Sequence, residues 1–342
     1  MAVVGAGVMG SEIAQAVAAG GVEVVLFDAD PAALERGLAH IDRIGRRRIE
    51  RGRMTEDEAR AVLGRVSAAG EDAALADCDL AVEAVPEILD VKHQVIARLD
   101  AALPDGALIA SNTSGLSISD IAAPTSRPDR VVGLHFFNPA SVMKLVEVIR
   151  GDTTSDATMD AAEAFARALG KVPVRVRECP GFLVNRILVR AMAEAYRAAA
   201  GSGADLAAAD AAVVAGGPAP MGPFALGDLI GLDTLGHIQR DLEAAYGDRF
   251  ADAGEIALRV QAGRLGAKSG GGFFDGPAPQ ADADGPGRGV AERYYESAQD
   301  EATRCVAEEI ASPADVDLAM RHGCGWSAGP LEWVGGDEGR TR

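Results

Sequence analysis

A histidine and a glutamate stand in two mainly apolar runs, and their spacing predicts that they meet. His135 closes the run Val131–Phe137, and Glu147 lies in the returning run Met143–Ile149. If these runs form a hairpin that turns about Ser141, residues 135 and 147 stand opposite each other, because opposing positions keep a constant sum. A carboxylate against an imidazole raises its basicity and fixes its orientation, as a general base requires. By spacing alone, a core histidine and a surface glutamate are an equally good interpretation.

A glycine-rich segment near the start has the spacing of a dinucleotide-binding turn. In such a turn the first glycine allows the tight bend, the second lets the backbone approach a pyrophosphate, and the third lets helix and strand pack closely. Asp28 ends the next apolar run, 18 residues after Gly10, where an acid accepts the ribose hydroxyls and repels a 2′-phosphate. The pattern favours NAD over NADP; the alternative is an ordinary strand–turn–helix with a solvated Asp28. The predicted binding residues are Gly5, Gly7, Val8, Met9, Gly10 and Asp28.

The elements that must position these residues alternate in type over residues 1–178. Short apolar runs predict strands, and longer segments between them predict helices. Strands that are apolar on both faces and separated by helices are typical of a parallel sheet covered on both sides. We therefore predict a Rossmann-type α/β domain. The predicted strands are Ala2–Val4, Val22–Phe27, Leu80–Val85, Ala107–Ala110, Val131–Phe137, Leu145–Ile149 and Val172–Val176, and the predicted helices are Val8–Ala19, Pro31–Arg51, Glu87–Ala102 and Ser155–Leu169.

The pattern changes after Pro180-Gly181, where strand-like runs stop and Ala-rich helical segments begin. Further on, Gly276–Gly289 contains little but Gly, Pro, Ala, Asp, Gln and Arg, the composition of a flexible linker. We predict an NAD-binding domain over residues 1–178 and an all-α domain over residues 179–275. A linker over residues 276–290 then leads to a further helical segment over residues 291–342.

That last segment repeats part of the helical domain. A shift of 107 residues aligns Asn185–Leu226 with Glu292–Trp333 without a gap. The matches other than Ala keep a fixed spacing, which predicts a duplicated helical unit whose second copy is cut short at the end of the sequence. The matching pairs include Arg186 with Arg293, Glu194 with Glu301, Arg197 with Arg304, Asp210 with Asp317, and Gly222-Pro223 with Gly329-Pro330.

Charge and composition exclude several classes of function. With 33 Lys+Arg against 51 Asp+Glu the formal net charge is -18, which argues against general binding to nucleic acid or anionic membranes. No apolar run approaches the length of a membrane span, and nothing at the N-terminus has the pattern of a secretory signal. The four cysteines form no CxxC pair and no cluster with histidine, so neither a disulfide framework nor a metal site is expected. The default expectation is a reduced, cytoplasmic protein.

A series of motifs, in order and correctly separated over nearly the whole chain, resembles the signatures of the L-3-hydroxyacyl-CoA dehydrogenase family. The two around the candidate base are HFFNP at 135–139 and MKLVE at 143–147. The resemblance points to the subgroup that acts on 3-hydroxybutyryl-CoA and similar short acyl-CoAs, some members of which carry two copies of the helical domain. The other motifs are GAGVMGSEIA at 5–14, VEAVPEILDVK at 82–92, SNTSGLSIS at 111–119, PGFLVNR at 180–186, PMGPFALGDLIGLD at 220–233 and GRLGAKSGGGFF at 263–274.

The resemblance implies roles for four residues in catalysis. His135 would be the general base that takes the 3-hydroxyl proton as hydride leaves C3 for the nicotinamide, and Glu147 would be its partner. Ser114 would hydrogen-bond the substrate oxygen beside the cofactor, and Asn185 would help to hold the polar end of the substrate near His135. The alternatives are a Ser114 that caps a helix and an Asn185 that merely ends one.

The resemblance also places further residues against the cofactor. Glu87, Lys92 and Lys268 fall on family positions that contact NAD. For Lys92 the alternative is a solvated surface lysine.

The helix expected after Asp28 carries six arginines within eleven residues, on a chain that is otherwise acidic. Coenzyme A carries a 3′-phosphate and a pyrophosphate, and guanidinium groups bind phosphate well. The resemblance places contacts to the adenosine phosphate of CoA on this helix, so Arg47 and Arg51 are predicted to bind CoA, with Ser114 at the acyl end. The alternative is a solvated face paired with Asp42 and Glu50. The six are Arg43, Arg46, Arg47, Arg48, Arg51 and Arg53.

Taken together, these features predict NAD-dependent, reversible oxidation of a short L-3-hydroxyacyl-CoA to the 3-oxoacyl-CoA in fatty acid metabolism. One alternative is the same chemistry on an acyl group carried by an acyl carrier protein, and another is a non-catalytic NAD-binding or structural homologue. Family members with one helical domain pair through it, so a homodimer through this domain is expected unless the second copy covers that surface.

Overall fold

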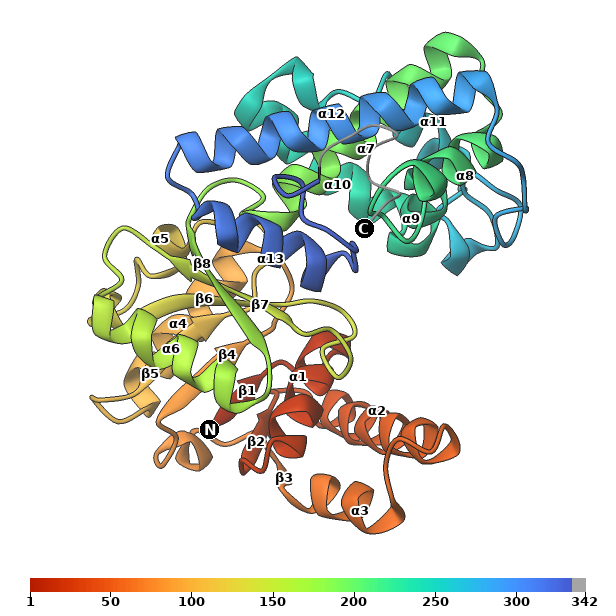
Figure 1. The fold of residues 1–342 in the computed structure, drawn as a ribbon. Helices are drawn as coiled ribbons and strands as arrows, with labels where there is room; N and C mark the ends of the chain where they lie inside the picture. Colours follow the sequence, from red (N-terminus) through yellow and green to blue (C-terminus); the bar gives the residue numbers. More distant parts are fainter. Residues whose placement is uncertain (334–342) are drawn as a thin grey trace. The chain divides into compact units, whose positions relative to one another are not determined.

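The chain forms two compact units. A computed structural model describes residues 1–333. The N-terminal unit comprises Met1–Glu178, and the C-terminal unit begins at Cys179. The first is built on a β-sheet and the second is helical (Figure 1).

A single eight-stranded sheet organises the N-terminal unit, in the order β3-β2-β1-β4-β5-β6-β7-β8. The first six strands in this order are parallel, β7 runs antiparallel to β6, and β8 is parallel to β7. The sheet is therefore mainly parallel, as predicted, and the exception is the β6–β7 hairpin that the spacing of residues 135 and 147 indicated. The short connection from β6 to β7 allows only an antiparallel pairing. The strands are β1 Ala2–Val4, β2 Val24–Phe27, β3 Val66–Ala69, β4 Leu80–Glu83, β5 Leu108–Ser111, β6 Val131–Phe136, β7 Leu145–Arg150 and β8 Val172–Arg177.

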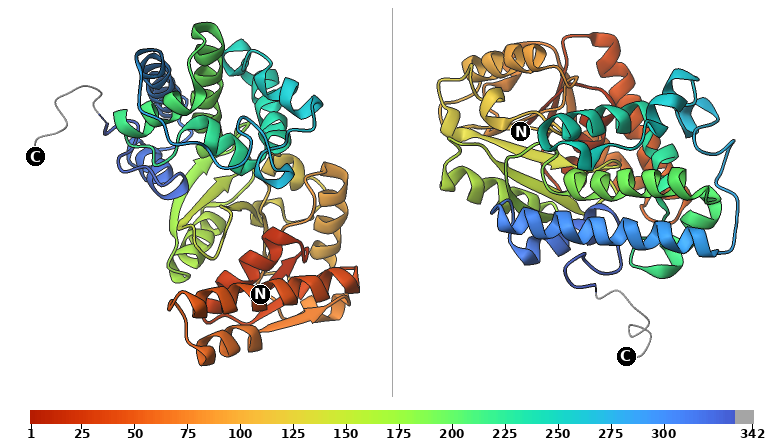
Figure 2. Two further views of the ribbon diagram at one scale, coloured as in Figure 1. Left: turned by 90° about the vertical axis from the view of Figure 1, so that its right-hand side faces the viewer. Right: turned by 90° about the horizontal axis from the view of Figure 1, so that it is seen from above.

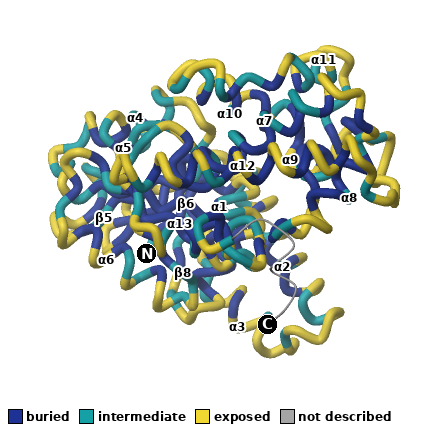
Figure 3. The backbone as a smooth tube through the Cα atoms, turned by 45° about the horizontal axis from the view of Figure 1, so that its top comes forward, coloured by how far each residue is buried: buried dark blue, intermediate teal, exposed yellow. Residues whose placement is uncertain are grey.

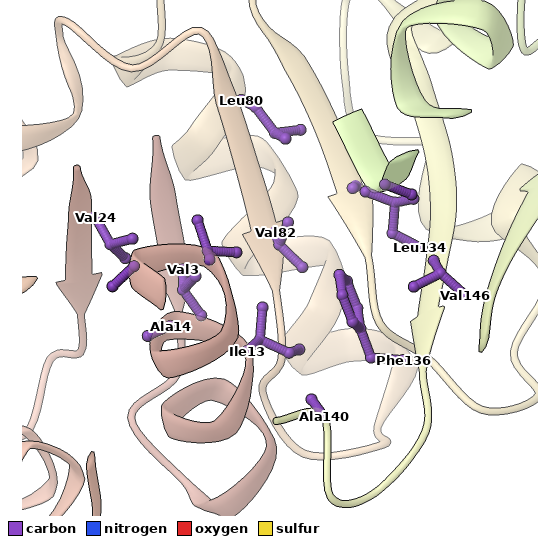
Figure 4. Packing of buried hydrophobic residues seen from close by; sticks show 14 of the residues in the cluster. Val3, Ile13, Ala14, Val24, Leu80, Val82, Leu134, Phe136, Ala140 and Val146 are labelled. Carbon is purple, nitrogen blue, oxygen red and sulfur yellow. The ribbon is translucent and has the colours of Figure 1, made fainter. Parts of the chain in front are cut away.

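Helices cover both faces of this sheet. Side chains of α1 and α6 join the strands in one apolar cluster, in which Ile13 and Phe136 lie close to Ala140 of the turn after β6 (Figure 4). Helix α4 packs on the other face against β4 and β5, through the buried side chains of Ile96 and Leu99. The helices are α1 Val8–Ala19, α2 Pro31–Glu50, α3 Glu56–Gly64, α4 Leu89–Ala102, α5 Ile118–Ile121 and α6 Asp156–Ala168.

Strand β3 and helix α3 are absent from the sequence prediction. Strand β3 reads VSAA and lies at the edge of the sheet, with its two middle residues exposed, so it has no long apolar run to find. Helix α3 carries a signal that the prediction overlooked, since Thr55 and Glu58 form a capping box at its N-terminus. In contrast to β3, the central strands of the sheet consist mostly of buried residues, which Figure 3 shows in dark blue.

The C-terminal unit is built around two long helices that pack along each other. Helix α12 lies against α7 and α8, and Figure 2 shows α7 and α12 side by side. The helices of this unit are α7 Val184–Ser202, α8 Leu206–Gly216, α9 Pro223–Ile230, α10 Leu232–Tyr246, α11 Glu255–Gln261, α12 Gly285–Ala307 and α13 Pro313–Gly323.

Elements of this unit recur at the shift of 107 residues found in the sequence. Helix α13 occupies the positions of α8 moved by 107. Asp210 accepts a hydrogen bond from the backbone N–H of Phe224, and Asp317 accepts the equivalent bond from Leu331. The matching helices and the matching bond support a duplicated unit.

The predicted linker is too long at its C-terminal end. Helix α12 begins at Gly285, where Asp284 caps it by accepting the backbone N–H of Gly287 and Pro286 stands in its first turn. Glycine and proline in a capped first turn have the composition of a linker but are compatible with a helix start. Of the predicted linker, only residues 276–284 therefore lie outside a helix.

Candidate functional site

His135 and Glu147 face each other across the β6–β7 hairpin. They pair in the register that the spacing predicted, and the His135 Nδ1 to Glu147 Oε2 distance is 2.7 Å. Both residues are buried: Glu147 has no exposed surface, and His135 is 5% exposed. A carboxylate acts only as an acceptor, so Nδ1 carries the proton in this bond and Nε2 is the basic nitrogen of the neutral ring. The tilted ring of Phe137 lies 4.6 Å from the imidazole, centroid to centroid, and restricts its rotation.

The end of the neighbouring strand, β5, carries Ser114 towards the same edge of the sheet. Ser111 of β5 pairs with Gly133 of β6, so the segments that follow the two strands leave the sheet side by side. Asn112 joins them by accepting a hydrogen bond of 2.8 Å from the backbone N–H of Phe136. Ser114 is not a helix cap, because α5 is capped by Ser117. Its placement is compatible with the predicted contact to the substrate oxygen.

The glycine turn between β1 and α1 has the geometry that its sequence predicts. Gly5 has φ of 102°, and a Cβ on it would lie 2.7 Å from the carbonyl oxygen of Ala84. A Cβ on Gly10 would lie 1.8 Å from the carbonyl oxygen of Gly5, so helix and strand could not pack as they do. Around Gly7, in contrast, no atom comes within 4 Å of an added Cβ. This open side, at the start of α1, fits a pyrophosphate.

Asp28 lies at the end of β2, beside that turn. Its two carboxylate oxygens accept hydrogen bonds of 2.8 Å from Ala6 N–H and 2.9 Å from Asp30 N–H. A cavity of about 120 Å³ adjoins it, with an apolar lining that includes Phe27 and Leu75. Arg98 also lines this cavity, its guanidinium 4.7 Å above the ring of Phe27. An apolar cavity next to an acid fits the adenosine half of NAD, and Arg98 is a lining residue that the sequence prediction missed.

A buried charge network connects the loops after β4 and β5. Glu83, fully buried at the end of β4, accepts hydrogen bonds of 2.8 Å from Lys92 Nζ, 2.7 Å from Val85 N–H and 2.6 Å from Ser111 Oγ. Lys92 also lies 3.1 Å from a carboxylate oxygen of Glu87. Sequence reasoning missed Glu83, although an acid that ends an apolar strand was the available signal.

Lys92 is not the solvated lysine of the alternative. Its side chain is only 1% exposed, and its ammonium donates to Glu83 and to the backbone oxygen of Val85 and pairs with Glu87. These three acceptors match the three N–H donors of an ammonium. Lys92 therefore holds Glu87 in place, and its predicted contact with NAD stays a prediction.

Glu87 in turn holds the loop that carries Ser114. It accepts hydrogen bonds from the hydroxyl of Thr113 and, at 2.9 Å, from the backbone N–H of Ser114. Burial raises the pKa of Glu87, but Lys92 and the two hydrogen-bond donors outweigh it and bring the pKa below the ordinary value. Glu87 is thus held as a carboxylate directly beside Ser114.

The arginines of α2 and its C-terminal end divide into two groups. Arg46 pairs with Asp42 and Arg48 donates to the backbone oxygen of Ser141, so these two are engaged within the unit. Arg47 and Arg51 are exposed and form no ion pair among the residues that the structure describes, whereas the pair between Arg46 and Asp42 agrees with the solvated-face alternative. Two exposed guanidinium groups one helical turn apart suit a phosphate-bearing ligand.

Asn185 and Lys268 belong to the C-terminal unit. Asn185 is half-buried in the first turn of α7, and Lys268 Nζ forms an ion pair of 2.6 Å with Asp233. Their roles towards the substrate and NAD stay predictions. Within residues 1–333 no cluster of three or more His, Cys, Asp or Glu side chains is arranged to hold a metal ion, and no helix is long and apolar enough to cross a membrane.

Family comparisons agree with the site geometry in both units. Residues 1–179 match the model of the 3-hydroxyacyl-CoA dehydrogenase NAD binding domain. Residues 181–276 and 290–335 match the model of the 3-hydroxyacyl-CoA dehydrogenase C-terminal domain. The chain belongs to the 3-hydroxyacyl-CoA dehydrogenase family. The Rossmann-type fold, the NAD cofactor and the dehydrogenase activity predicted from the sequence are confirmed at the level of this family.

Individual members of the 3-hydroxyacyl-CoA dehydrogenase family are similar over most of the chain. A probable 3-hydroxybutyryl-CoA dehydrogenase of Bacillus subtilis is 42% identical over 274 residues, 80% of this chain and 96% of the relative. A 3-hydroxybutyryl-CoA dehydrogenase of Clostridioides difficile is 40% identical over 80% of this chain and 98% of the relative. The crystal structure of 3-hydroxybutyryl-CoA dehydrogenase from Escherichia coli K12 superposes with a TM-score of 0.91 at 30% identity, over 97% of this chain and 90% of that one. None of these relatives favours the carrier-protein or non-catalytic alternative.

Proposed function

We propose that this chain oxidises a short-chain L-3-hydroxyacyl-CoA to the 3-oxoacyl-CoA with NAD, and that His135 is the general base. NAD-dependent oxidation of a 3-hydroxyacyl-CoA is the reaction of the family. The observation that carries the role of His135 is its buried bond to Glu147, at the edge of the sheet where Ser114 also lies. The preference for a short acyl chain follows the relatives named as 3-hydroxybutyryl-CoA dehydrogenases.

When bound, NAD supplies the electrophilic nicotinamide carbon that accepts a hydride from C3 of the substrate. The remaining work falls to this chain's own residues. Nε2 of His135 accepts the 3-hydroxyl proton, while Glu147 holds the ring through Nδ1 and stabilises the imidazolium that results. The hydroxyl of Ser114 orients the substrate oxygen, and Glu87 fixes the loop from which Ser114 projects.

NAD would be held by the glycine turn and by Asp28. The backbone around Gly7 leaves room for the pyrophosphate, and the cavity beside Asp28 would receive the adenosine. A 2′-phosphate there would be repelled by the Asp28 carboxylate. Arg47 and Arg51 would bind the phosphates of CoA, and Asn185 and Lys268 would complete the substrate and cofactor contacts from the C-terminal unit. A homodimer through that unit belongs to the same proposal.

The test of the reaction is NADH formation from L-3-hydroxyacyl-CoAs of increasing chain length, with the D-enantiomers as control. We expect the highest kcat/KM with 3-hydroxybutyryl-CoA, and NADP should be a far poorer oxidant than NAD. Replacement of Asp28 by alanine should narrow the gap between NAD and NADP. Faster turnover with NADP, or turnover only when the acyl group is on a carrier protein, would contradict the proposal.

The test of the base is substitution of His135 and Glu147. His135→Gln keeps the approximate size but cannot accept the proton, so turnover should fall by about 10²- to 10⁴-fold while NAD binding is nearly unchanged. Glu147→Gln should lower turnover substantially, and the double variant should be little worse than His135→Gln, because the two residues act as one unit. His237→Gln, on the surface of the C-terminal unit, is the matched control. A His135→Gln enzyme that keeps most of its turnover would place the base elsewhere.

A further inference from the structure

The turn between the base and its carboxylate is held by charged side chains from outside the hairpin. We call residues 137–144, between β6 and β7, the hairpin tip. One residue separates His135 from the start of the tip and two separate Glu147 from its end, so movement of the tip displaces both members of the catalytic pair. The tip is only partly fixed by its own bonds, in which the backbone N–H groups of Val142 and Met143 donate to the oxygen of Pro139.

Glu12 of α1 binds the centre of the tip across a sequence separation of 129 residues. Its Oε2 accepts a hydrogen bond of 3.2 Å from the backbone N–H of Ser141. Its Oε1 lies 3.3 Å from Nε2 of His40 on α2, and Nδ1 of His40 lies 3.2 Å from the guanidinium of Arg43. Arginine only donates, so Nδ1 of His40 accepts and Nε2 donates to Glu12. Glu12 is 6% exposed, and the bonds at both of its carboxylate oxygens fix its orientation.

Two cations bind the carbonyl oxygens of the same segment. Arg48 of α2 donates to the backbone oxygen of Ser141 at 3.1 Å. Lys171, directly before β8, donates to the oxygen of Ala140 and, at 2.8 Å, to the oxygen of Met143. The N–H and the C=O of Ser141 are therefore both held, each by a charged group on a different helix.

The three charges form one local cluster around an apolar seat. Burial lowers the pKa of Lys171, Arg48 lowers it further, and Glu12 opposes both. In the same segment the side chain of Ala140 is 1% exposed and packs in the cluster that contains Ile13 and Phe136 (Figure 4). The three charged side chains therefore act on the same turn of the chain, each through its own hydrogen bonds to the backbone of the tip.

We propose that Glu12, Arg48 and Lys171 are positioning residues for the catalytic base, which act by holding the hairpin tip and through it the reach of His135. This inference rests on the proposed role of His135. Catalytic groups need to be held within a fraction of an ångström, and small misplacements cost turnover without abolishing binding.

The first experiment compares variants of Glu12 and Arg48 in the full-length enzyme. Glu12→Ala removes the bond to Ser141, and we expect kcat to fall roughly tenfold while the Kd for NADH changes by less than about twofold. Arg48→Gln should lower kcat in the same way. Glu12→Gln keeps an oxygen that can accept from Ser141 N–H, so it should restore most of the turnover. A Glu12→Gln enzyme as slow as Glu12→Ala would overturn the proposal, because the bond to the tip would then be irrelevant.

Two surface variants serve as controls. Glu35→Ala removes an exposed carboxylate of α2, and Arg60→Gln removes an exposed guanidinium of α3 that pairs only with Asp57 among the ion pairs of residues 1–333. Both should leave kcat and the KM values at those of the wild type. If they slow the enzyme as much as Arg48→Gln does, a general charge effect replaces the positioning effect.

The decisive experiment repeats the substitutions in the His135→Gln background. If the tip acts through the base, Glu12→Ala and Arg48→Gln should cost no further turnover once the base is gone. An equal loss in both backgrounds would overturn the positioning role while leaving the base assignment intact. A His135→Gln enzyme with nearly full turnover would instead overturn the proposed base, so the two failures are distinguishable. Because Glu12→Gln and Arg48→Gln change little volume, the test stands even if Glu12→Ala folds poorly.

Discussion

Helices α7 and α8 of the C-terminal unit have counterparts 107 residues later in α12 and α13. Charged residues at the matched positions differ in their burial and in their ion-pair partners. Arg186 on α7 is fully buried and donates to Glu301 at 2.7 Å, and its two terminal nitrogens bind the carboxylate of Glu308. Its counterpart on α12, Arg293, is exposed. Glu194, the counterpart of Glu301, bonds instead to Arg190 and Arg197 of its own helix.

The difference indicates that the second copy completes the first rather than repeating its work. Burial opposes ionisation of Arg186, but Glu308 and Glu301 outweigh it and raise the pKa of the guanidinium. A buried arginine without these carboxylates would be an uncompensated charge, which is strongly destabilising. The position equivalent to Asn185, in turn, is an exposed Glu292. The first copy thus carries the predicted substrate residue, and the second supplies carboxylates that balance a buried charge of the first.

Removing the second copy should have the largest effect. A chain that ends before Val290 lacks Glu301 and Glu308 and exposes the faces of α7 and α8 that α12 covers. We expect aggregation or new self-association, measured by light scattering and size-exclusion chromatography, while His135 and Glu147 keep their places in the N-terminal unit. A truncated protein that stays monomeric and as stable as the full chain would refute the structural role.

Equivalent glutamates should differ sharply in their contribution to stability. Glu301→Gln leaves Arg186 short of one buried charge partner, so the free energy of unfolding should fall by about 3 kcal/mol. Glu194→Gln, at the matched position, disrupts only pairs along its own helix and should cost less than about 1 kcal/mol. Urea denaturation of both variants measures the difference. Equal losses in the free energy of unfolding would mean that Glu194 and Glu301 contribute equally to stability, which would contradict the proposed difference between the two copies.

Catalysis should show the opposite asymmetry. Asn185→Ala should lower kcat/KM for the acyl-CoA roughly tenfold, about 1.4 kcal/mol, the cost of losing a substrate hydrogen bond. Glu292→Ala, at the matched position of the second copy, should leave kcat/KM unchanged. Steady-state kinetics with one substrate is sufficient, and an Asn185→Ala enzyme with wild-type kinetics would remove Asn185 from the site.

The smallest expected effect concerns the pH dependence of stability. Burial raises the pKa of Asp210 to about 6, more than the two backbone N–H bonds it accepts can offset. A carboxyl whose pKa is raised on folding contributes its full stability below the unfolded pKa and loses it as the pH rises through the folded value. Between pH 5 and 7.5 the wild type should therefore lose about 1 kcal/mol relative to Asp210→Asn.

Asp317, the matched residue of the second copy, sharpens this comparison. Burial also raises its pKa, but the charge of Arg321 lowers it in addition to the backbone hydrogen bonds, so Asp317→Asn should change the pH profile less than Asp210→Asn. Urea midpoints of both variants and the wild type at the two pH values measure the difference. A larger pH effect at Asp317 would reverse the ranking of the two copies.

The sequence predicted the central strands of the sheet closely, because strands buried on both faces must be apolar along their whole length. Strand β1 and helix α1 coincide with their predicted bounds. The prediction from the sequence failed at the edge strand β3, whose two middle residues are exposed. It also failed at the start of α12, where a capped helix begins with glycine and proline. Local pattern predicts an element well only where burial constrains its composition.

For the candidate site, the sequence by itself determined the positions of the glycine turn and Asp28, and the register in which a hairpin would oppose residues 135 and 147. Hairpin register and turn geometry depend on neighbours within a few residues, and the residue types record them. Only the tertiary structure decided that Lys92 is enclosed by acids, that Glu12 reaches Ser141, and that Arg186 meets Glu301. Each of these contacts joins different elements, and which charge is buried against which depends on how those elements pack. The identity of a charged residue does not reveal whether its side chain is buried, because the same residue type occurs both in solvent and in a core.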